Sequence, residues 1–368
     1  MIQDIIRLQK RDKADCSLLG FLAISTNRVL WVRLGLVLIL NLLVFSASAA
    51  KLSSPWDVLP KSTALRSAEC PTANSLSPDL TASSYYKRSA KGPVVDKVLL
   101  AEYQNATAPF WRAANKVVSL SDLYRSTGNI DVAYCVANFL NKLAASNTLA
   151  GRMRGPQAEY VRVWMLNAYA TSWLKVRGAI PEENRAQKNV PTWLAKLSGR
   201  VIEYYEPRNR KNNLRYWAGL AVMSASIAAD RQDLFNWALA SYDVGIDEIK
   251  PDGTLPLEME RGNRAAHYHN FAAAPLVLMA ELANENGLNL YSKDDYAIKR
   301  LVNFIIRLFS DSSGVVRIPS LPQNQVQPNS SSFAWLYSYA KRFPGEIDPH
   351  IFEKFDRRDN LYMGGVVP

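Results

Sequence analysis

The feature that most constrains the fold is a recurrence of mostly apolar residues at three- and four-residue steps from about residue 97 onward. This spacing places the side chains on one face of a helix. Alternating β patterning is nearly absent, and 314–318 is the best strand candidate. The sequence therefore predicts an all-α fold. The clearest recurring residues are Tyr160, Val163, Trp164, Asn167, Ala168, Thr171 and Leu174, then Tyr216, Leu220, Met223 and Ile227.

Helix-breaking residues and a weak internal repeat indicate how these helices are arranged. Breaks are expected at Gly128, 178–181, Pro207, 251–253 and Gly287. Residues 127–137 resemble 229–238, because each segment is a short turn that opens a helix on an acid, Asp131 or Asp233. Such repeated segments predict stacked antiparallel helical hairpins in a curved array or closed ring. The alternative is a TPR-like solenoid, although the spacing does not follow that family's repeat of about 34 residues.

The N-terminal 50 residues carry the pattern of an export signal. Residues 34–44 contain no charge, Arg28 and Arg33 stand before them, and Ala47-Ser48-Ala49 follows. The alternative is a membrane anchor, but a span needs about 20 apolar residues. We therefore predict a signal peptide within 1–50, cleaved after Ala49 or Ala50. Residues 1–28 are long for its basic region, so translation is expected to begin further in.

Export predicts a periplasmic or secreted protein without stable membrane insertion after cleavage. Residues 51–96 are rich in Ser, Pro and Ala and predict an extended N-terminal arm, which leaves 97–368 as the helical domain. Cys70 and Cys135 are the cysteines of the mature chain. In an oxidising compartment they predict one disulfide, with two buried free thiols as the alternative.

The mature chain carries an excess of positive charge. The whole sequence has a formal net charge of +11, and residues 1–50 hold six basic and three acidic residues, which leaves about +8. An anionic partner is expected, and outside the cytoplasm an acidic polysaccharide is the natural one. The basic residues are scattered rather than grouped in runs, so no nucleic-acid partner is expected. The protein is expected to be a monomer.

Two segments concentrate polar residues where helix cores would be apolar, namely 211–219 and 255–270. His267 and His269 flank Tyr268 in the second. A helical zinc pair needs histidines four positions apart, so no metal site is predicted. The sequence also lacks a phosphate loop, a G-x-S-x-G elbow and a cysteine with a base, and no cofactor is expected.

A tyrosine with Arg, Asn and His nearby suits removal of a carbon-bound proton beside a carboxylate. Arg261, Asn213 and a protonated histidine would stabilise the dianion that forms at C5 of a uronic acid. Tyrosine titrates near about 10 in water, so it acts as a base only where cations lower its pKa, as Arg261 would for Tyr268. The same phenol would return the proton to O4 and complete a β-elimination that needs neither water nor cofactor.

Four motifs in order carry a resemblance to a known family. Asn212-Asn213-x-x-Tyr216-Trp217-Ala218 is similar to the motif N-N-H-S-Y-W-A of the periplasmic alginate lyases, the poly(β-D-mannuronate) lyases of polysaccharide lyase family 5. Segments 230–238, 252–258 and 261–270 continue in family order, so the resemblance runs from about Ser119 to Leu282. It implies an (α/α) toroid with a substrate groove. It also implies Tyr268 as acid/base, Arg261 as its pKa-lowering partner and Asn213 as carboxylate neutraliser.

One departure separates this chain from that motif. Leu214 stands where the family has its catalytic histidine, and leucine can neither donate to a carboxylate nor take a proton. We predict that His267 fills the gap, oriented by Glu260. This change points to a divergent relative acting on an alginate-, polymannuronate- or glucuronan-like polymer. The alternative is a non-catalytic lyase-like polysaccharide-binding protein of the envelope.

Further side chains of the same segments are candidates for substrate binding, and each also has a structural interpretation. A histidine can also serve as a structural hydrogen-bonding group, aromatic residues often belong to a core, and Asn213 would suit a helix cap. The substrate-binding candidates are His269, Glu260, Arg264, Tyr216 and Trp217.

Overall fold

The helices expected from residue 97 onward are present in the computed structural model, which describes residues 51–62, 69–89, 92–310, 321–322 and 324–368. The signal peptide predicted in 1–50 and the strand candidate 314–318 lie outside these residues. The helices are α2 (Lys97–Thr127), α3 (Ile130–Ala145), α4 (Pro156–Val176), α5 (Arg185–Tyr205), α6 (Asn213–Ala229), α7 (Gln232–Glu248), α8 (Pro256–Met259), α9 (Ala265–Asn284), α10 (Lys293–Phe309), α11 (Trp335–Arg342) and α12 (Pro349–Lys354).

Short elements connect these helices. Three two-stranded ladders occur in the described chain: β1 (Leu80–Thr81) with β4 (Met153–Arg154) in parallel, β2 (Tyr86–Ser89) with β3 (Gly92–Val95) antiparallel, and β5 (Asp359–Asn360) with β6 (Gly365–Val366) antiparallel. Single 3-10 turns are η1 (Arg177–Ala179), η2 (Glu206–Arg208), η3 (Gly262–Arg264), η4 (Leu290–Ser292), η5 (Ser330–Phe333) and η6 (Leu361–Met363).

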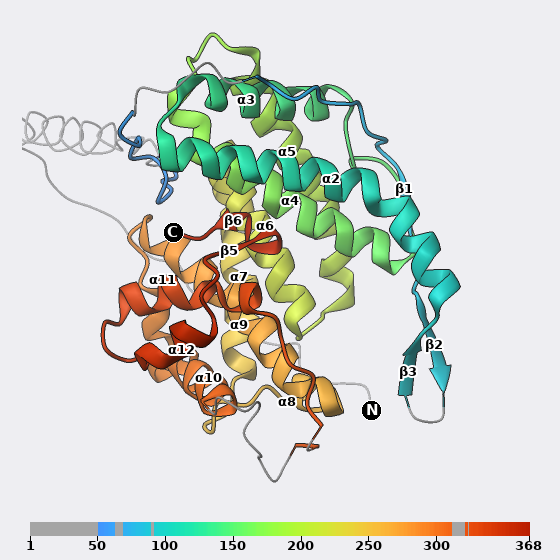
Figure 1. Ribbon diagram of the computed structural model, residues 1–368, viewed down its shortest axis with the longest axis vertical. Coiled ribbons are helices and arrows are strands. Elements are labelled where there is room, and N and C mark those ends of the chain that lie inside the picture. Colours follow the sequence, from blue (N-terminus) through green and yellow to red (C-terminus); the bar gives the residue numbers. More distant parts are fainter. Residues whose placement is uncertain (1–50, 63–68, 90–91, 311–320, 323) are drawn as a thin grey trace, which may run out of the picture. The chain divides into compact units, whose positions relative to one another are not determined.

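The helices form two layers of antiparallel hairpins, as the repeat predicted. In the inner layer α2 packs on α4, α4 on α6, α6 on α9, and α9 on α11, while α3, α5, α7 and α10 lie outside (Figure 1). Helices α4 and α6 are buried around almost their whole circumference. This burial requires apolar or small residues on every face and explains why both segments are so rich in Ala, Val, Leu and Met.

The predicted helix boundaries coincide with the chain's turn residues. Gly128 ends α2 in the left-handed conformation with φ 65°, and its N–H donates to the Tyr124 carbonyl. The two acids of the internal repeat, Asp131 and Asp233, both lie in the first turn of a helix, α3 and α7 respectively. An acid there stabilises the positive end of the helix dipole.

The arm predicted at 51–96 contains no helix in its described residues and runs along the helical body. Cys70 forms a disulfide with Cys135 of α3, with the Cα atoms 5.0 Å apart. Nearer its start, the Leu52 N–H donates to Asp230 Oδ1 at 2.8 Å. The arm ends in the β2–β3 hairpin, which projects beyond the end of α2 (Figure 1). No described helix is long and apolar enough to cross a bilayer.

A buried ion pair fixes the C-terminal segment against the inner helices. The Lys175 side chain of α4 is 1% exposed, lies 2.5 Å from Asp122 of α2, and donates to the Gly364 carbonyl at 2.7 Å. Asp122 also accepts the Val366 N–H at 3.0 Å. Burial lowers the pKa of Lys175, and the Asp122 carboxylate opposes this effect. The segment around Gly364 and Val366 is thereby held against α2 and α4.

We predict that Asp122→Ala destabilises the fold by about 3 kcal/mol, because it leaves the buried Lys175 ammonium without its carboxylate. The matched control is Asp243→Ala, which breaks the half-exposed pair with Lys293 and should cost less than about 1 kcal/mol. Urea unfolding followed by circular dichroism measures both. Equal losses in the two variants would contradict a structural role for the buried pair.

Candidate active site

A cleft of about 680 Å³ opens where α4, α6 and α9 meet the β2 strand and the C-terminal segment. It collects most of the candidates predicted from the sequence: Asn213, Arg261, Arg264, His267, Tyr268 and Trp217 all line it. Leu214, at the position of the departure from the family motif, lines it as well. The remaining lining residues are Tyr85, Tyr86, Gln157, Tyr160, Trp164, Arg210, Asn212, Phe271, Val326, Asn329, Ser332, Asn360, Tyr362 and Met363.

Glu258, on the short helix α8, organises one wall of this cleft. Its side chain is 1% exposed, and one carboxylate oxygen accepts both the Asn213 backbone N–H at 3.0 Å and the Asn213 Nδ2 at 2.8 Å. The other oxygen lies 3.4 Å from Arg261 Nε. The bond to Glu258 uses one of the two Nδ2 hydrogens of Asn213, so the second hydrogen remains available for donation to a substrate.

Asn213 is not the N-cap of α6, which was the structural interpretation of this residue. Asn212 is the N-cap residue and makes no side-chain capping hydrogen bond, whereas Asn213 is the first helical residue. The physical reason is that the Glu258 carboxylate already satisfies the Asn213 N–H, as a cap would otherwise do.

Two arginines flank Tyr268 at the start of α9. The Arg261 guanidinium lies over the Tyr268 ring, 4.8 Å from its centroid. Arg264 lies over the ring of Tyr86 at 5.6 Å and donates to the Tyr86 hydroxyl at 3.3 Å. The pKa of Arg264 is raised, first by this hydrogen bond and further by its interaction with Tyr268. The guanidinium of Arg264 is therefore charged where it interacts with the phenol of Tyr268.

His267 is largely buried in the same wall. Burial lowers the pKa of its imidazole, and the positive charge of Arg264 lowers it further. The ring stacks on Phe271 with centroids 6.0 Å apart and meets Tyr268 edge-on at 5.2 Å. The imidazole is thus neutral near pH 7, which differs from the protonated histidine expected from the sequence.

Buried polar atoms without a partner gather in this cleft. Six buried side-chain atoms of the described residues have no hydrogen bond, and three of them, Arg210 Nε, Asn212 Oδ1 and His267 Nδ1, belong to residues that line the cleft. Unsatisfied buried groups are rare and costly in native proteins. Their concentration at one place indicates a site that receives a polar ligand.

Aromatic rings continue the wall that His267 and Tyr268 form, through Phe271. Trp217 packs on Phe271 with centroids 4.8 Å apart and donates its Nε1–H to the Phe271 carbonyl at 3.1 Å. Tyr362, from the C-terminal segment, lies 5.0 Å from Trp164 in an edge-on contact. Trp217 therefore serves the core and the cleft wall together.

Three candidates do not line the cleft. His269 is fully buried, accepts the Leu255 N–H at Nε2 (2.9 Å), and donates from Nδ1 to the Ala265 carbonyl (2.8 Å). Tyr216 is buried and donates its hydroxyl to the Lys211 carbonyl. Glu260 is exposed on the surface beside η3. Each of these side chains has a structural or solvent-facing position.

The sequence interpretation missed lining residues that lie far from the polar motifs. Tyr85 and Tyr86 come from the arm, and Tyr362 comes from the last residues of the chain. Asn212 and Arg210 carried a local signal, because Asn212 lies in the polar stretch 211–219 and Arg210 immediately precedes it. No three His, Cys, Asp or Glu side chains of the described residues are arranged to hold a metal ion.

Comparison with known proteins decides the family. The alginate lyase family model matches residues 79–314. The chain belongs to the alginate lyase family. A polysaccharide lyase of Stenotrophomonas maltophilia (strain K279a) is 38% identical over 262 residues, which cover 68% of this chain and 78% of the relative. An alginate lyase of Pseudomonas syringae pv. syringae is 31% identical over 250 residues, which cover 66% of this chain and 65% of the relative.

Solved structures of alginate lyases share the fold. Alginate lyase A1-III from Sphingomonas species A1 superposes with a TM-score of 0.64 at 21% identity, covering 85% of this chain and 89% of that one. A histidine-to-alanine variant of A1-III complexed with tetrasaccharide superposes with a TM-score of 0.66. The predicted (α/α) toroid is thereby confirmed, and the chain is an enzyme of the alginate and polysaccharide lyase family.

We predict that His269 makes folding stability depend on pH. Burial lowers its pKa to about 4 in the folded state, against an ordinary value of 6.5. The unfolded chain therefore binds a proton more readily, and stability should fall as pH drops from about 6.5 towards about 4. His269→Gln should weaken this dependence, as measured by urea unfolding across that range.

The control for this prediction is His350→Gln. His350 is exposed, and its hydrogen bond with Glu353 raises its pKa. Its contribution to folding stability is therefore present at low pH and is lost as pH rises, the opposite of His269. If His269→Gln and the native protein showed the same loss on acidification, His269 would not be its source.

Proposed function

We propose that this enzyme cleaves a uronate-containing polysaccharide, alginate-like or polymannuronate-like, by β-elimination. The observation that carries the proposal is the Arg261 guanidinium over the Tyr268 ring, in a cleft that Arg264 also lines and where Glu258 holds Asn213 in place. The names of the relatives agree with this substrate class, since alginate lyases are among them.

Neutralisation of the substrate carboxylate is the first requirement of this reaction. Removing the C5 proton places a second negative charge next to the existing carboxylate, which makes the proton weakly acidic. Arg261 supplies a positive charge at the cleft wall, and the second Nδ2 hydrogen of Asn213 supplies a donor for the substrate carboxylate. Because Glu258 fixes both groups before substrate arrives, little reorganisation is needed during the reaction.

Tyr268 then moves one proton from carbon to oxygen. As phenolate it removes the C5 proton, and the electron pair left at C5 forms the C4–C5 double bond while the C4–O4 bond breaks. The phenol returns its proton to O4 of the leaving chain, so the enzyme ends unchanged. Two cations of the cleft accompany this step: Arg261 lies over the Tyr268 ring, and Arg264 interacts with the same side chain.

His267 takes part as a neutral hydrogen-bonding group rather than as a cation. Its imidazole is buried, and its Nδ1 has no partner among the described residues. Leu214 lines the same cleft and supplies no polar atom where the family motif has histidine. We infer that His267, from α9, provides the contact to substrate that the family obtains from α6.

We propose that the enzyme works in the periplasm or outside the cell. The Cys70–Cys135 disulfide supports this location, because such bonds persist in oxidising compartments. The predicted signal peptide supports it as well. An acidic extracellular polymer also suits the excess of about +8 on residues 51–368.

The test mixes purified mature protein with polymannuronate, glucuronan and hyaluronan and follows the ultraviolet absorbance of the C4–C5 double bond. Tyr268→Phe should lower kcat by about 10³-fold or more, because it removes the group that carries the proton. The control Tyr296→Phe changes an exposed tyrosine outside the cleft and should retain full activity. Normal turnover by Tyr268→Phe would rule out Tyr268 as the group that carries the proton.

A pH profile tests the role of His267. Because its pKa lies below 6.5, the imidazole stays neutral at neutral pH, and activity should fall only when acidification protonates it. We expect His267→Gln to keep part of the activity and to lose this acidic limb in kcat. An unchanged acidic limb in the variant would assign the titration to another group.

The alternative of a binding protein without catalysis makes a different prediction in the same assay. It requires saturable binding of the polymer and no absorbance rise, whereas Leu214→His would create activity. Restoring the histidine should change existing activity only modestly if His267 already fills its place.

A further inference from the structure

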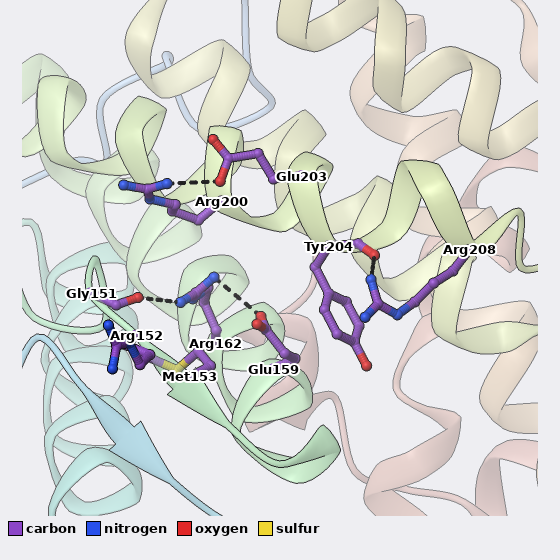
Figure 2. Close-up of a pocket in the computed structure, with 9 residues that line it drawn as sticks. All are labelled: Gly151, Arg152, Met153, Glu159, Arg162, Arg200, Glu203, Tyr204 and Arg208. Atoms are coloured by element: carbon purple, nitrogen blue, oxygen red, sulfur yellow. Dashed lines mark hydrogen bonds and ion pairs between the residues drawn. The ribbon is translucent and has the colours of Figure 1, made fainter.

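A second pocket, of about 510 Å³, lies outside the catalytic cleft and shares no lining residue with it. Its walls come from the loop before β4, from α4, from the C-terminal end of α5 and from η2 (Figure 2). Its charged side chains are four arginines and two glutamates: Arg152, Arg162, Arg200, Arg208, Glu159 and Glu203. The pocket therefore has a net positive charge, and its volume suits a small polar ligand.

Two of the arginines are committed to the protein. Arg162 is almost fully buried, donates to the Gly151 carbonyl at 2.8 Å and pairs with Glu159 at 3.1 Å (Figure 2). Arg200 pairs with Glu203 at 2.8 Å. These pairs neutralise both glutamates and define the shape of the pocket. The Nε of Arg162 is buried without a partner, a further sign of an incompletely satisfied polar site.

The other two arginines, Arg152 and Arg208, supply the free charge. Both are exposed, and neither has a carboxylate within salt-bridge distance among the residues described. The Arg208 guanidinium lies 3.8 Å from the centroid of the Tyr204 ring. This stacking restricts the side chain before a ligand arrives, which lowers the entropy lost on binding.

The pocket and the catalytic cleft are neighbours along two elements. Glu159 lines the pocket, and the next residue of α4, Tyr160, lines the cleft. Arg208 lines the pocket, and Arg210 lines the cleft two residues later. The two sites also interact electrostatically. Burial is the main cause of the raised pKa of Tyr160, and Tyr204, which lines the pocket, raises it further.

We propose that this pocket is an accessory binding site for a stretch of carboxylate-bearing sugars of the polymer that extends beyond the catalytic cleft, with Arg152 and Arg208, at opposite sides of the pocket (Figure 2), as its anion-binding groups. The inference rests on the proposed function for the identity of the polymer. A guanidinium forms charge-assisted hydrogen bonds with a carboxylate, and two of them at one pocket favour a uronate over a neutral sugar. The site gives long chains an additional point of attachment and leaves the chemistry at Tyr268 unchanged.

The experiment measures binding without turnover, by isothermal titration of Tyr268→Phe with long and short oligomannuronates. Adding Arg152→Gln and Arg208→Gln should weaken binding of the long oligomer roughly tenfold and leave the short one unaffected. The matched control adds Arg185→Gln and Lys188→Gln, which remove the same charge from the other end of α5, about 20 Å away. These exposed control residues should change neither affinity by more than about twofold.

The outcomes separate the pocket from the proposed function. The proposed role of the pocket is rejected if the arginine variants bind the long oligomer as tightly as before, or if they bind both lengths equally less tightly. It is also rejected if the control pair has the same effect. Equally tight binding of a neutral oligosaccharide overturns its preference for uronates. If the native enzyme cleaves no acidic polymer while the arginine pair still causes a length-dependent loss, the proposed function fails and the pocket stands.

Discussion

The buried carboxylate of Glu258 is the constraint on which the active cleft depends. A charge that is 1% exposed is costly unless every oxygen is paired, and here the partners are the Asn213 amide groups and Arg261. Those partners lie on α6 and in the turn before α9. Satisfying one buried charge therefore fixes the distance between the two elements that carry the chemistry.

A second buried charge closes the site from the other end of the chain. Lys175 lies inside α4, and its ammonium group donates to Asp122 and to the Gly364 carbonyl. Holding Gly364 there places η6 against α4, and Tyr362 consequently enters the aromatic wall beside Trp164. A stabilising interaction in the core and a lining residue of the cleft are thus two consequences of one ion pair.

The helical hairpins, the family and six cleft residues were predictable, because each depends on local sequence. Spacing of apolar residues sets a helix face, and motifs near Asn213 and Arg261 carry their order with them. The assignments of His269 and Tyr216 to substrate binding had no such basis. A polar residue in a motif is equally suited to bond the backbone, as both do here, and only burial and partners distinguish the two uses.

The sequence by itself determined an all-α protein of the alginate lyase type, with a tyrosine, an arginine and an asparagine as its chemical candidates. The tertiary structure decided that Arg264 and Arg261 flank that tyrosine, that His267 is neutral, and that Tyr86 and Tyr362 complete the cleft. It also brought Arg152 and Arg208 into one pocket. The reason is physical: burial and the encounter of distant segments set pKa values and pockets, and neither property is encoded in local spacing.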